Sequence, residues 1–144
     1  MVPQTRSRVL CVDDDVDVGE MLAVLLNAYG VDATCVQTAA DAWLEINKET
    51  FCLYVLDGWL PHVDGFEFCR QIREADFDTP ILFYSGAAYE ADREKGIAAG
   101  ATAYVAKPDV DCLMETVVRL LAVPMDNALG RATAGCLLRG QPST

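Results

Sequence analysis

The chain has 144 residues, 52% of them hydrophobic and 23% charged, which is the size and composition of one soluble globular domain with a core of its own. Its 22 acidic and 11 basic residues give a net charge of −11, which disfavours direct binding to nucleic acids and anionic membranes because both need a basic surface. No apolar run reaches the roughly 18 residues that cross a bilayer. No signal-peptide pattern follows the N-terminus either, so we expect a cytoplasmic protein.

Short apolar runs alternate along the chain with longer stretches of helical periodicity. Runs of this length are typical of strands buried on both faces, as in a parallel sheet. We expect strands at residues 9–12, 31–36, 51–56, 81–84 and 103–106. After each run, apolar residues recur at steps of three and four, which predicts amphipathic helices. We expect helices at residues 18–29, 39–46, 66–72, 89–99 and 110–121, the fourth with little apolar stripe.

This alternation of strand and helix predicts an α/β fold, an open doubly wound parallel sheet with helices on both faces. Five units are too few for an eight-stranded barrel. Gly30 and Gly100 stand where the first and fourth helices should end, as glycines after helices commonly do. We expect one domain over residues 8–121, with an N-terminal extension at 1–7 and a tail or linker stub at 122–144.

The six cysteines include no C-x-x-C pair of the kind that metal sites use. Most of them fall within apolar runs or helical stripes. This placement favours buried free thiols that act as small hydrophobic side chains in a reducing compartment. The six are Cys11, Cys35, Cys52, Cys69, Cys112 and Cys136.

Polar residues follow directly after four of the predicted strands, at the edge of the sheet where open α/β folds bind ligands. They are Asp13, Asp14 and Asp15 after the first strand, Asp57 after the third, Ser85 after the fourth, and Lys107 with Pro108 after the fifth. Taken singly, each is an ordinary turn residue or helix cap, and we expect Asp15 to serve only as a cap. Together they would bring carboxylates, a hydroxyl and an ammonium group to one edge.

Three of these carboxylates, those of Asp13, Asp14 and Asp57, would repel one another unless a cation neutralised them. Mg²⁺, with Mn²⁺ as a substitute, suits such oxygen ligands. A carboxylate beside the ion can attack a phosphoryl group, because the metal shields the anionic oxygens that approach. A lysine and a hydroxyl nearby could then hold the transferred phosphoryl oxygens.

The same residues form an ordered set of motifs. They are V-D-D at residues 12–14, L-D-x-x-L-P-x-x-D-G at 56–65, Ser85 after an apolar strand, and G-A-x-A-Y-x-x-K-P at 100–108. Together they resemble the receiver domains of response regulators in two-component signalling, over roughly residues 8–121. The resemblance implies a (βα)₅ fold of flavodoxin-like strand order 2-1-3-4-5. It also implies phosphorylation by a sensor histidine kinase or a histidine phosphotransfer domain.

By position, the resemblance implies that Asp57 accepts the phosphoryl group. Asp14 and Asp57 would ligate Mg²⁺ directly, helped by the backbone carbonyl of Trp59. Asp13 would act mainly through water. Such a domain is not an enzyme in the ordinary sense, because it catalyses only its own phosphorylation and slow dephosphorylation.

The resemblance also assigns the residues that respond to the phosphoryl group. Ser85 would hydrogen-bond one phosphoryl oxygen and Lys107 would pair with another. Tyr104 matches the aromatic residue that swings inward when the hydroxyl moves toward the phosphate, and the peptide between Lys107 and Pro108 is expected to be cis. Phosphorylation would reshape the face made by the fourth helix, fifth strand and fifth helix. That face would control an attached output domain, another protein or a second copy of the chain.

Two side chains near the acceptor depart from the common pattern. Trp59 is a large aromatic residue two positions past Asp57, and Ala87 offers no functional side chain two positions past Ser85. Trp59 could shield the acyl phosphate from water, or it could be a surface contact for a partner. His62, the only histidine, is interpreted as a surface loop residue.

Other site classes fit the sequence less well. A phosphatase of the haloacid dehalogenase type uses D-x-D-x-T/V, and here Asp13 and Asp15 are followed by Asp17 in place of Thr or Val. A calcium-binding EF-hand loop starting at Asp13 fails, since it would have Val18 in place of Gly and Val24 in place of Glu. A receiver that no longer accepts phosphate and acts only as a docking module is the remaining alternative.

Overall fold

The computed structural model describes residues 7–87 and 89–121. Their five main strands form one parallel sheet in the order β2-β1-β3-β6-β7. The strands are β1 (Arg8–Val12), β2 (Asp32–Val36), β3 (Leu53–Leu56), β6 (Ile81–Ser85) and β7 (Ala103–Ala106). Since β6 and β7 are the fourth and fifth strands of this sheet, the predicted flavodoxin-like order 2-1-3-4-5 is confirmed.

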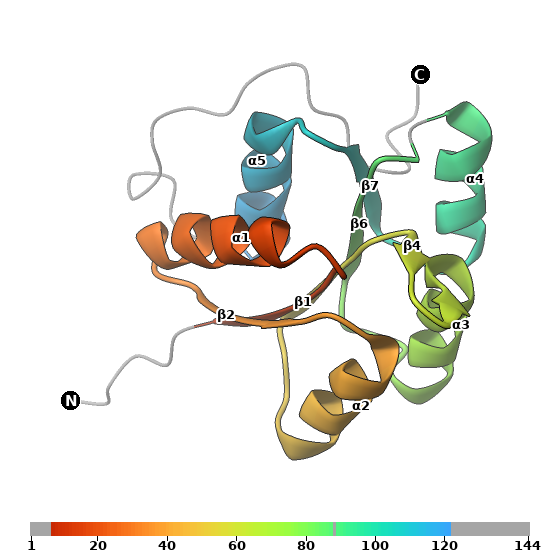
Figure 1. The fold of residues 1–144 in the computed structure, drawn as a ribbon, viewed down its shortest axis with the longest axis horizontal. Helices are drawn as coiled ribbons and strands as arrows, with labels where there is room; N and C mark the ends of the chain where they lie inside the picture. The colour runs from red at the N-terminus through yellow and green to blue at the C-terminus, as the bar shows by residue number, and fades with distance from the viewer. Residues whose placement is uncertain (1–6, 88, 122–144) are drawn as a thin grey trace.

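The five helices of the described residues cover the two faces of the sheet (Figure 1). They are α1 (Val16–Ala28), α2 (Ala39–Lys48), α3 (Gly65–Ala75), α4 (Glu90–Ala98) and α5 (Val110–Leu121). Alternate residues of β1 enter two separate cores, Leu10 and Val12 on the side of α2 and α3, and Val9 and Cys11 on the side of α1 and α5. Packing on both faces explains why the strands are continuously apolar.

The sheet has buried central strands and a more exposed edge. Every residue of β3 and of β6 is buried, whereas β2 at the edge has exposed or half-buried positions throughout. This explains why the run at residues 31–36 includes the polar residues Asp32 and Thr34. Among the described residues, no helix combines the length and apolar character needed to cross a bilayer.

Two helices begin or end at the capping and terminating residues that the sequence predicts. Asp15 is the N-cap of α1 and its carboxylate accepts the amide N–H of Asp17 at 3.0 Å, as expected. Gly30 and Gly100 have φ values of +80° and +113°, which end α1 and α4 in a conformation that glycine adopts without strain. Of the predicted extension at residues 1–7 only Ser7 is described, and the predicted tail at 122–144 lies outside the described residues.

The sequence analysis did not predict a short hairpin that follows Asp57. β4 (Trp59–Leu60) and β5 (Val63–Asp64) pair antiparallel across a turn at Pro61 and His62. His62 is exposed, as predicted, and its φ of +68° places it in the left-handed region. Two-residue strands carry no measurable periodicity, so no sequence pattern indicated them.

The cysteine prediction was partly wrong. Cys11 and Cys69 are free and buried as expected, but Cys35 and Cys52 are free and exposed. Cys112 is disulfide-bonded rather than free, and Cys136 lies outside the described residues. Cysteine spacing does not reveal pairing, because pairing depends on which segments the fold brings together. Cys35 is exposed because β2 is an edge strand.

Candidate functional site

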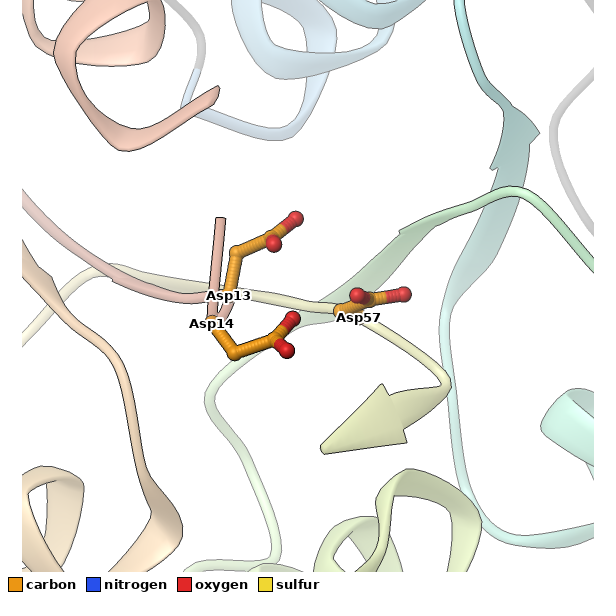
Figure 2. A group of neighbouring side chains, drawn as sticks. All are labelled: Asp13, Asp14 and Asp57. Atoms are coloured by element: carbon orange, nitrogen blue, oxygen red, sulfur yellow. The ribbon is translucent and has the colours of Figure 1, made fainter. Parts of the chain in front are cut away.

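Three carboxylates meet at the carboxyl edge of the sheet. Asp13 and Asp14 follow β1 and Asp57 follows β3, and the parallel register of these strands aligns their ends. One carboxylate oxygen from each residue lies within 4.8 Å of the others (Figure 2). Asp13 and Asp57 are buried, with 5% and 7% exposure, whereas Asp14 is exposed. The predicted cluster of three carboxylates is therefore present.

Some neighbours of Asp57 raise the pKa of its carboxyl group and others lower it. Burial and the negative charge of Asp13 raise the pKa of Asp57, and Lys107 and the backbone amide of Trp59 partly offset this rise. Crowded, oxygen-only donors of this kind fit a small divalent cation such as Mg²⁺. A bound cation would offset the mutual repulsion of the three carboxylates.

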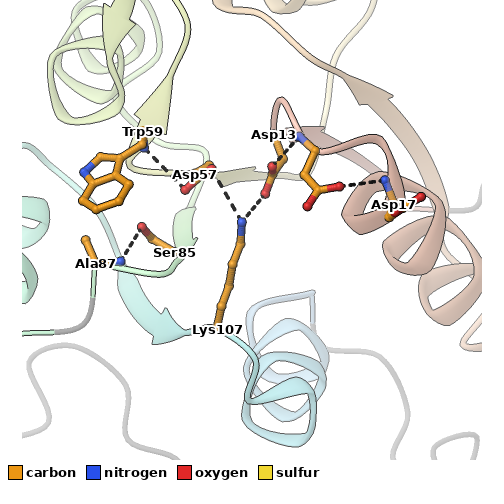
Figure 3. A network of polar contacts seen from close by, with 8 residues as sticks. Asp13, Asp17, Asp57, Trp59, Ser85, Ala87 and Lys107 are labelled. Carbon is orange, nitrogen blue, oxygen red and sulfur yellow. Dashed lines mark hydrogen bonds and ion pairs between the residues drawn. The ribbon is translucent and has the colours of Figure 1, made fainter.

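Lys107 reaches back across the site from the end of β7. Its ammonium nitrogen lies 2.6 Å from Asp13 Oδ2 and 3.5 Å from Asp57 Oδ2 (Figure 3). Burial would lower the pKa of Lys107, but the bond to Asp13 and the charge of Asp57 raise it above its ordinary value. Lys107 therefore stays cationic between two carboxylates. The peptide before Pro108 is cis, as expected.

Ser85 ends β6 on the other side of Asp57. Its side chain is fully buried, and its hydroxyl oxygen accepts the amide N–H of Ala87 at 3.1 Å. A Cβ atom at Gly58 would lie 3.0 Å from this oxygen, so glycine keeps the space between the acceptor loop and Ser85 open. The expected carboxylate, hydroxyl and ammonium groups thus come from four different segments and share one edge.

Asp15 takes no part in this cluster. Its carboxylate is exposed and bonds to the amide of Asp17, where it caps α1. The D-x-D interpretation therefore lacks a second carboxylate directed at the site, which argues against the phosphatase alternative.

Comparison with known proteins decides the family, since residues 9–118 match the family of response regulator receiver domains. The chain belongs to this family. It is 36% identical over 113 residues to the transcriptional regulatory protein TrcR of Mycobacterium tuberculosis, which covers 78% of the chain and 43% of that protein. The DNA-binding response regulator MtrA of Mycolicibacterium paratuberculosis is 33% identical over 103 residues, 72% of the chain and 45% of that protein.

Solved structures agree with this assignment. The chemotaxis response regulator CheY4 of Vibrio cholerae superposes with a TM-score of 0.75 at 28% identity, covering 81% of this chain and all of that one. The chain spans about half the length of the curated relatives it matches. The similarity therefore concerns the receiver domain, and not the remainder of those longer proteins.

In this receiver domain the side chain of Tyr104 is part of the hydrophobic core. The ring is buried and stacks on Phe83 at a centroid distance of 5.5 Å, and its hydroxyl donates to the carbonyl of Ala87. The guanidinium carbon of Arg93 lies 5.6 Å from the centroid of this ring, and one guanidinium N–H donates to the backbone carbonyl of Tyr104. A Cβ atom at Gly96 would come within 2.9 Å of the ring, so glycine makes this position possible.

Sequence reasoning missed the backbone of Ala87 as part of the site. Its N–H donates to Ser85 Oγ and its carbonyl accepts from Tyr104, so one residue connects the two predicted switch side chains. The side chain of Ala87 gave no signal because the contacts use backbone atoms.

The backbone of Trp59 contacts the site through a hydrogen bond to Asp57. Its amide N–H donates to Asp57 Oδ1 at 3.4 Å, while its indole is 70% exposed. Both interpretations of the side chain, as a shield and as a partner contact, stay open on these contacts. Its carbonyl as a metal ligand also stays a prediction.

Proposed function

We propose that the domain accepts a phosphoryl group on Asp57 from a sensor histidine kinase or a histidine phosphotransfer domain, in a Mg²⁺-dependent reaction. The observation that carries the proposal is the position of the Asp57 carboxylate, buried beside two further carboxylates and 3.5 Å from Lys107. A structural ion pair needs only one carboxylate and one lysine. The additional acidic groups are explained by a cation and an anionic substrate.

The ion would be held by Asp14 and Asp57 with the carbonyl of Trp59, and by Asp13 through water. When bound, Mg²⁺ offsets the negative charge of the incoming phosphoryl group. An oxygen of Asp57 attacks phosphorus, the bond from phosphorus to the donor nitrogen breaks, and the donor keeps that electron pair. Lys107 then exchanges one of its carboxylate partners for a phosphoryl oxygen.

The response would pass through Ser85 and Ala87 to Tyr104. The Ser85 hydroxyl now accepts from the Ala87 amide and must turn to donate to a phosphoryl oxygen. The same segment carries the Tyr104 hydroxyl on the Ala87 carbonyl, so a shift at Ser85 reaches the face formed by α4, β7 and α5. This shift would change the population of two states of that face.

The switched face would control an output in the cytoplasm. The matched relatives are longer than the chain, and their names, a transcriptional regulatory protein and a DNA-binding response regulator, support an attached or separate output partner. We propose no direct nucleic-acid contact for the receiver domain itself, given the net charge of −11. A second copy of the chain is the other partner that the face could bind.

The test is incubation with Mg²⁺ and acetyl phosphate or beryllofluoride, followed by intact mass and tryptophan fluorescence. We expect a labile adduct of about 80 Da, one phosphoryl group, that depends on Mg²⁺. Asp57→Asn should abolish it, while Asp15→Asn should retain it because asparagine also caps helices. A folded protein that takes up no phosphoryl group from any donor, kinase included, would favour the docking module instead.

A further inference from the structure

Two cysteines face each other beneath the acidic site. Cys11 in β1 and Cys35 in β2 are direct partners in the parallel register of these neighbouring strands. Adjacent strands lie about 4.8 Å apart, which is within the roughly 4.4–6.8 Å between Cα atoms that disulfides span. Both side chains lie on the same face, since Cys11 packs in the core that includes Leu22 of α1 and Cys35 bonds to Gly19 of that helix.

The thiols form a short hydrogen-bonded chain. Cys11 donates to Cys35, and Cys35 Sγ donates to the Gly19 carbonyl at 3.3 Å. The bond from Cys11 lowers the pKa of the Cys35 thiol, against the rise that its partial burial would cause. Oxidant-sensitive cysteines commonly combine a lowered thiol pKa, access to solvent and a neighbouring cysteine.

Only one of the two thiols is accessible. Cys11 is 1% exposed, whereas Cys35 is exposed and lines a cleft of about 310 Å³ between α1 and β2, together with Asp13 and Gly19. A small neutral oxidant can reach Cys35 through this cleft but has no comparable route to Cys11. The structure thus separates an attacking thiol from a resolving thiol.

We propose that Cys11 and Cys35 form an oxidisable pair in which a peroxide reacts at Cys35 and Cys11 closes a disulfide between β1 and β2. In the first step the Cys35 thiolate attacks one peroxide oxygen, the O–O bond breaks, and Cys35 becomes a sulfenic acid while hydroxide leaves. In the second step Cys11 sulfur attacks Cys35 sulfur and the sulfenic oxygen leaves as water. The two cysteines lose two electrons and the peroxide gains them.

The crosslink would form two residues before Asp13 and would withdraw the Cys35 thiol from Gly19 of α1. It goes beyond the proposed phosphorylation and does not depend on it. The other free thiols of the described residues are placed differently: Cys69 is buried and donates to the Ala99 carbonyl, and Cys52 is exposed in the segment before β3. Cys52 therefore provides a matched exposed control.

The experiment is treatment with hydrogen peroxide, alkylation of the remaining thiols, and non-reducing peptide mapping. We expect a peptide pair linked through Cys11 and Cys35, a loss of two free thiols per chain, and return of the Cys11 and Cys35 thiols with dithiothreitol. Cys52→Ser should behave like the unmodified chain, and Cys35→Ser should form no such link. In Cys11→Ala, the sulfenic acid at Cys35 should persist and be trapped by dimedone.

Three results would overturn the proposal: oxidation of Cys35 to sulfinic acid without a crosslink, a link between Cys35 and any other cysteine, or an unchanged thiol count. If Cys11→Ala does not fold, the unmodified chain, Cys35→Ser and Cys52→Ser still decide the question. None of these readouts requires Mg²⁺ or phosphate, so a failure here leaves the phosphorylation proposal untouched.

Discussion

Asp57 carries an unfavourable charge in the metal-free protein, because burial and Asp13 outweigh the help of Lys107 and the Trp59 amide. Its raised pKa means that the folded chain binds this proton more tightly than the unfolded chain. The contribution of Asp57 to the free energy of unfolding is therefore highest at acidic pH and falls as pH rises from the unfolded pKa through the raised folded pKa. At neutral pH the ionised carboxylate costs stability.

We predict that Asp57→Asn stabilises the metal-free protein at neutral pH, and that this gain shrinks as pH falls through the raised pKa. Urea unfolding of both proteins in the presence of a chelator measures the difference. Asp15→Asn, which lies outside the carboxylate cluster, serves as the control and should change stability little. A variant less stable than the parent at neutral pH would show that pairing with Lys107 dominates over burial.

The indole of Trp59 is a candidate for shielding a phosphorylated Asp57 from water. The backbone amide of Trp59 donates to Asp57 Oδ1 and the indole is exposed, so whether the indole shields an acyl phosphate at Asp57 can be tested by replacing the side chain. We predict that Trp59→Asn loses phosphate severalfold faster while its free energy of unfolding changes by no more than about 0.5 kcal/mol, as expected for an exposed side chain. Phosphate loss at an unchanged rate would assign the indole to partner contact.

At the scale of elements, the start of α3 is packed against the acceptor loop. A Cβ atom at Gly65 would lie 2.2 Å from the backbone oxygen of Asp57 and 2.8 Å from Gly58 Cα, and both are backbone atoms that cannot turn away. The Gly65 amide also donates to the Gly58 carbonyl at 3.0 Å. This contact explains the glycine of the D-G pair, since it lets helix and loop meet closely enough to hold Asp57 in place.

We predict that Gly65→Ala lowers the free energy of unfolding by about 1–3 kcal/mol, as overpacking does, and slows phosphorylation because Asp57 is displaced. Gly86→Ala is the matched control, because a Cβ atom there meets nothing within 4 Å. Chemical denaturation and adduct formation from acetyl phosphate measure the two effects. Equal stability of both variants would contradict the close packing of α3 on this loop.

At the scale of the whole molecule, a ligand that binds only the folded site stabilises the entire domain. The carboxylates come from the ends of β1 and β3, so the unfolded chain does not present them together. We predict that Mg²⁺ at 100 times its dissociation constant adds about 2.7 kcal/mol to the free energy of unfolding. Thermal unfolding with and without chelator measures this shift. Asp57→Asn should reduce it, and an equal shift in that variant would place the ion elsewhere.

Sequence reasoning alone identified the main strands and helices and the side chains that gather at the candidate site, but not the β4–β5 hairpin or the backbone of Ala87. Each buried strand is a continuous apolar run, Asp15 caps α1, and Gly30 ends it, because these features depend on neighbours along the chain. The motifs at the strand ends then indicated the family and its strand order, which the comparisons and the sheet confirm. The roles of the individual site residues stay predictions.

Only the tertiary structure decided which of these groups touch. Lys107 and Asp13 are 94 positions apart, yet Lys107 Nζ lies 2.6 Å from Asp13 Oδ2, and Ala87 joins Ser85 to Tyr104 through backbone groups that every residue except proline has. The pairing of Cys11 with Cys35 likewise follows from strand register, and the exposure of Cys35 from its place on the edge strand. Local patterns record the period and burial of one element, whereas contacts between elements depend on their order and register in the sheet.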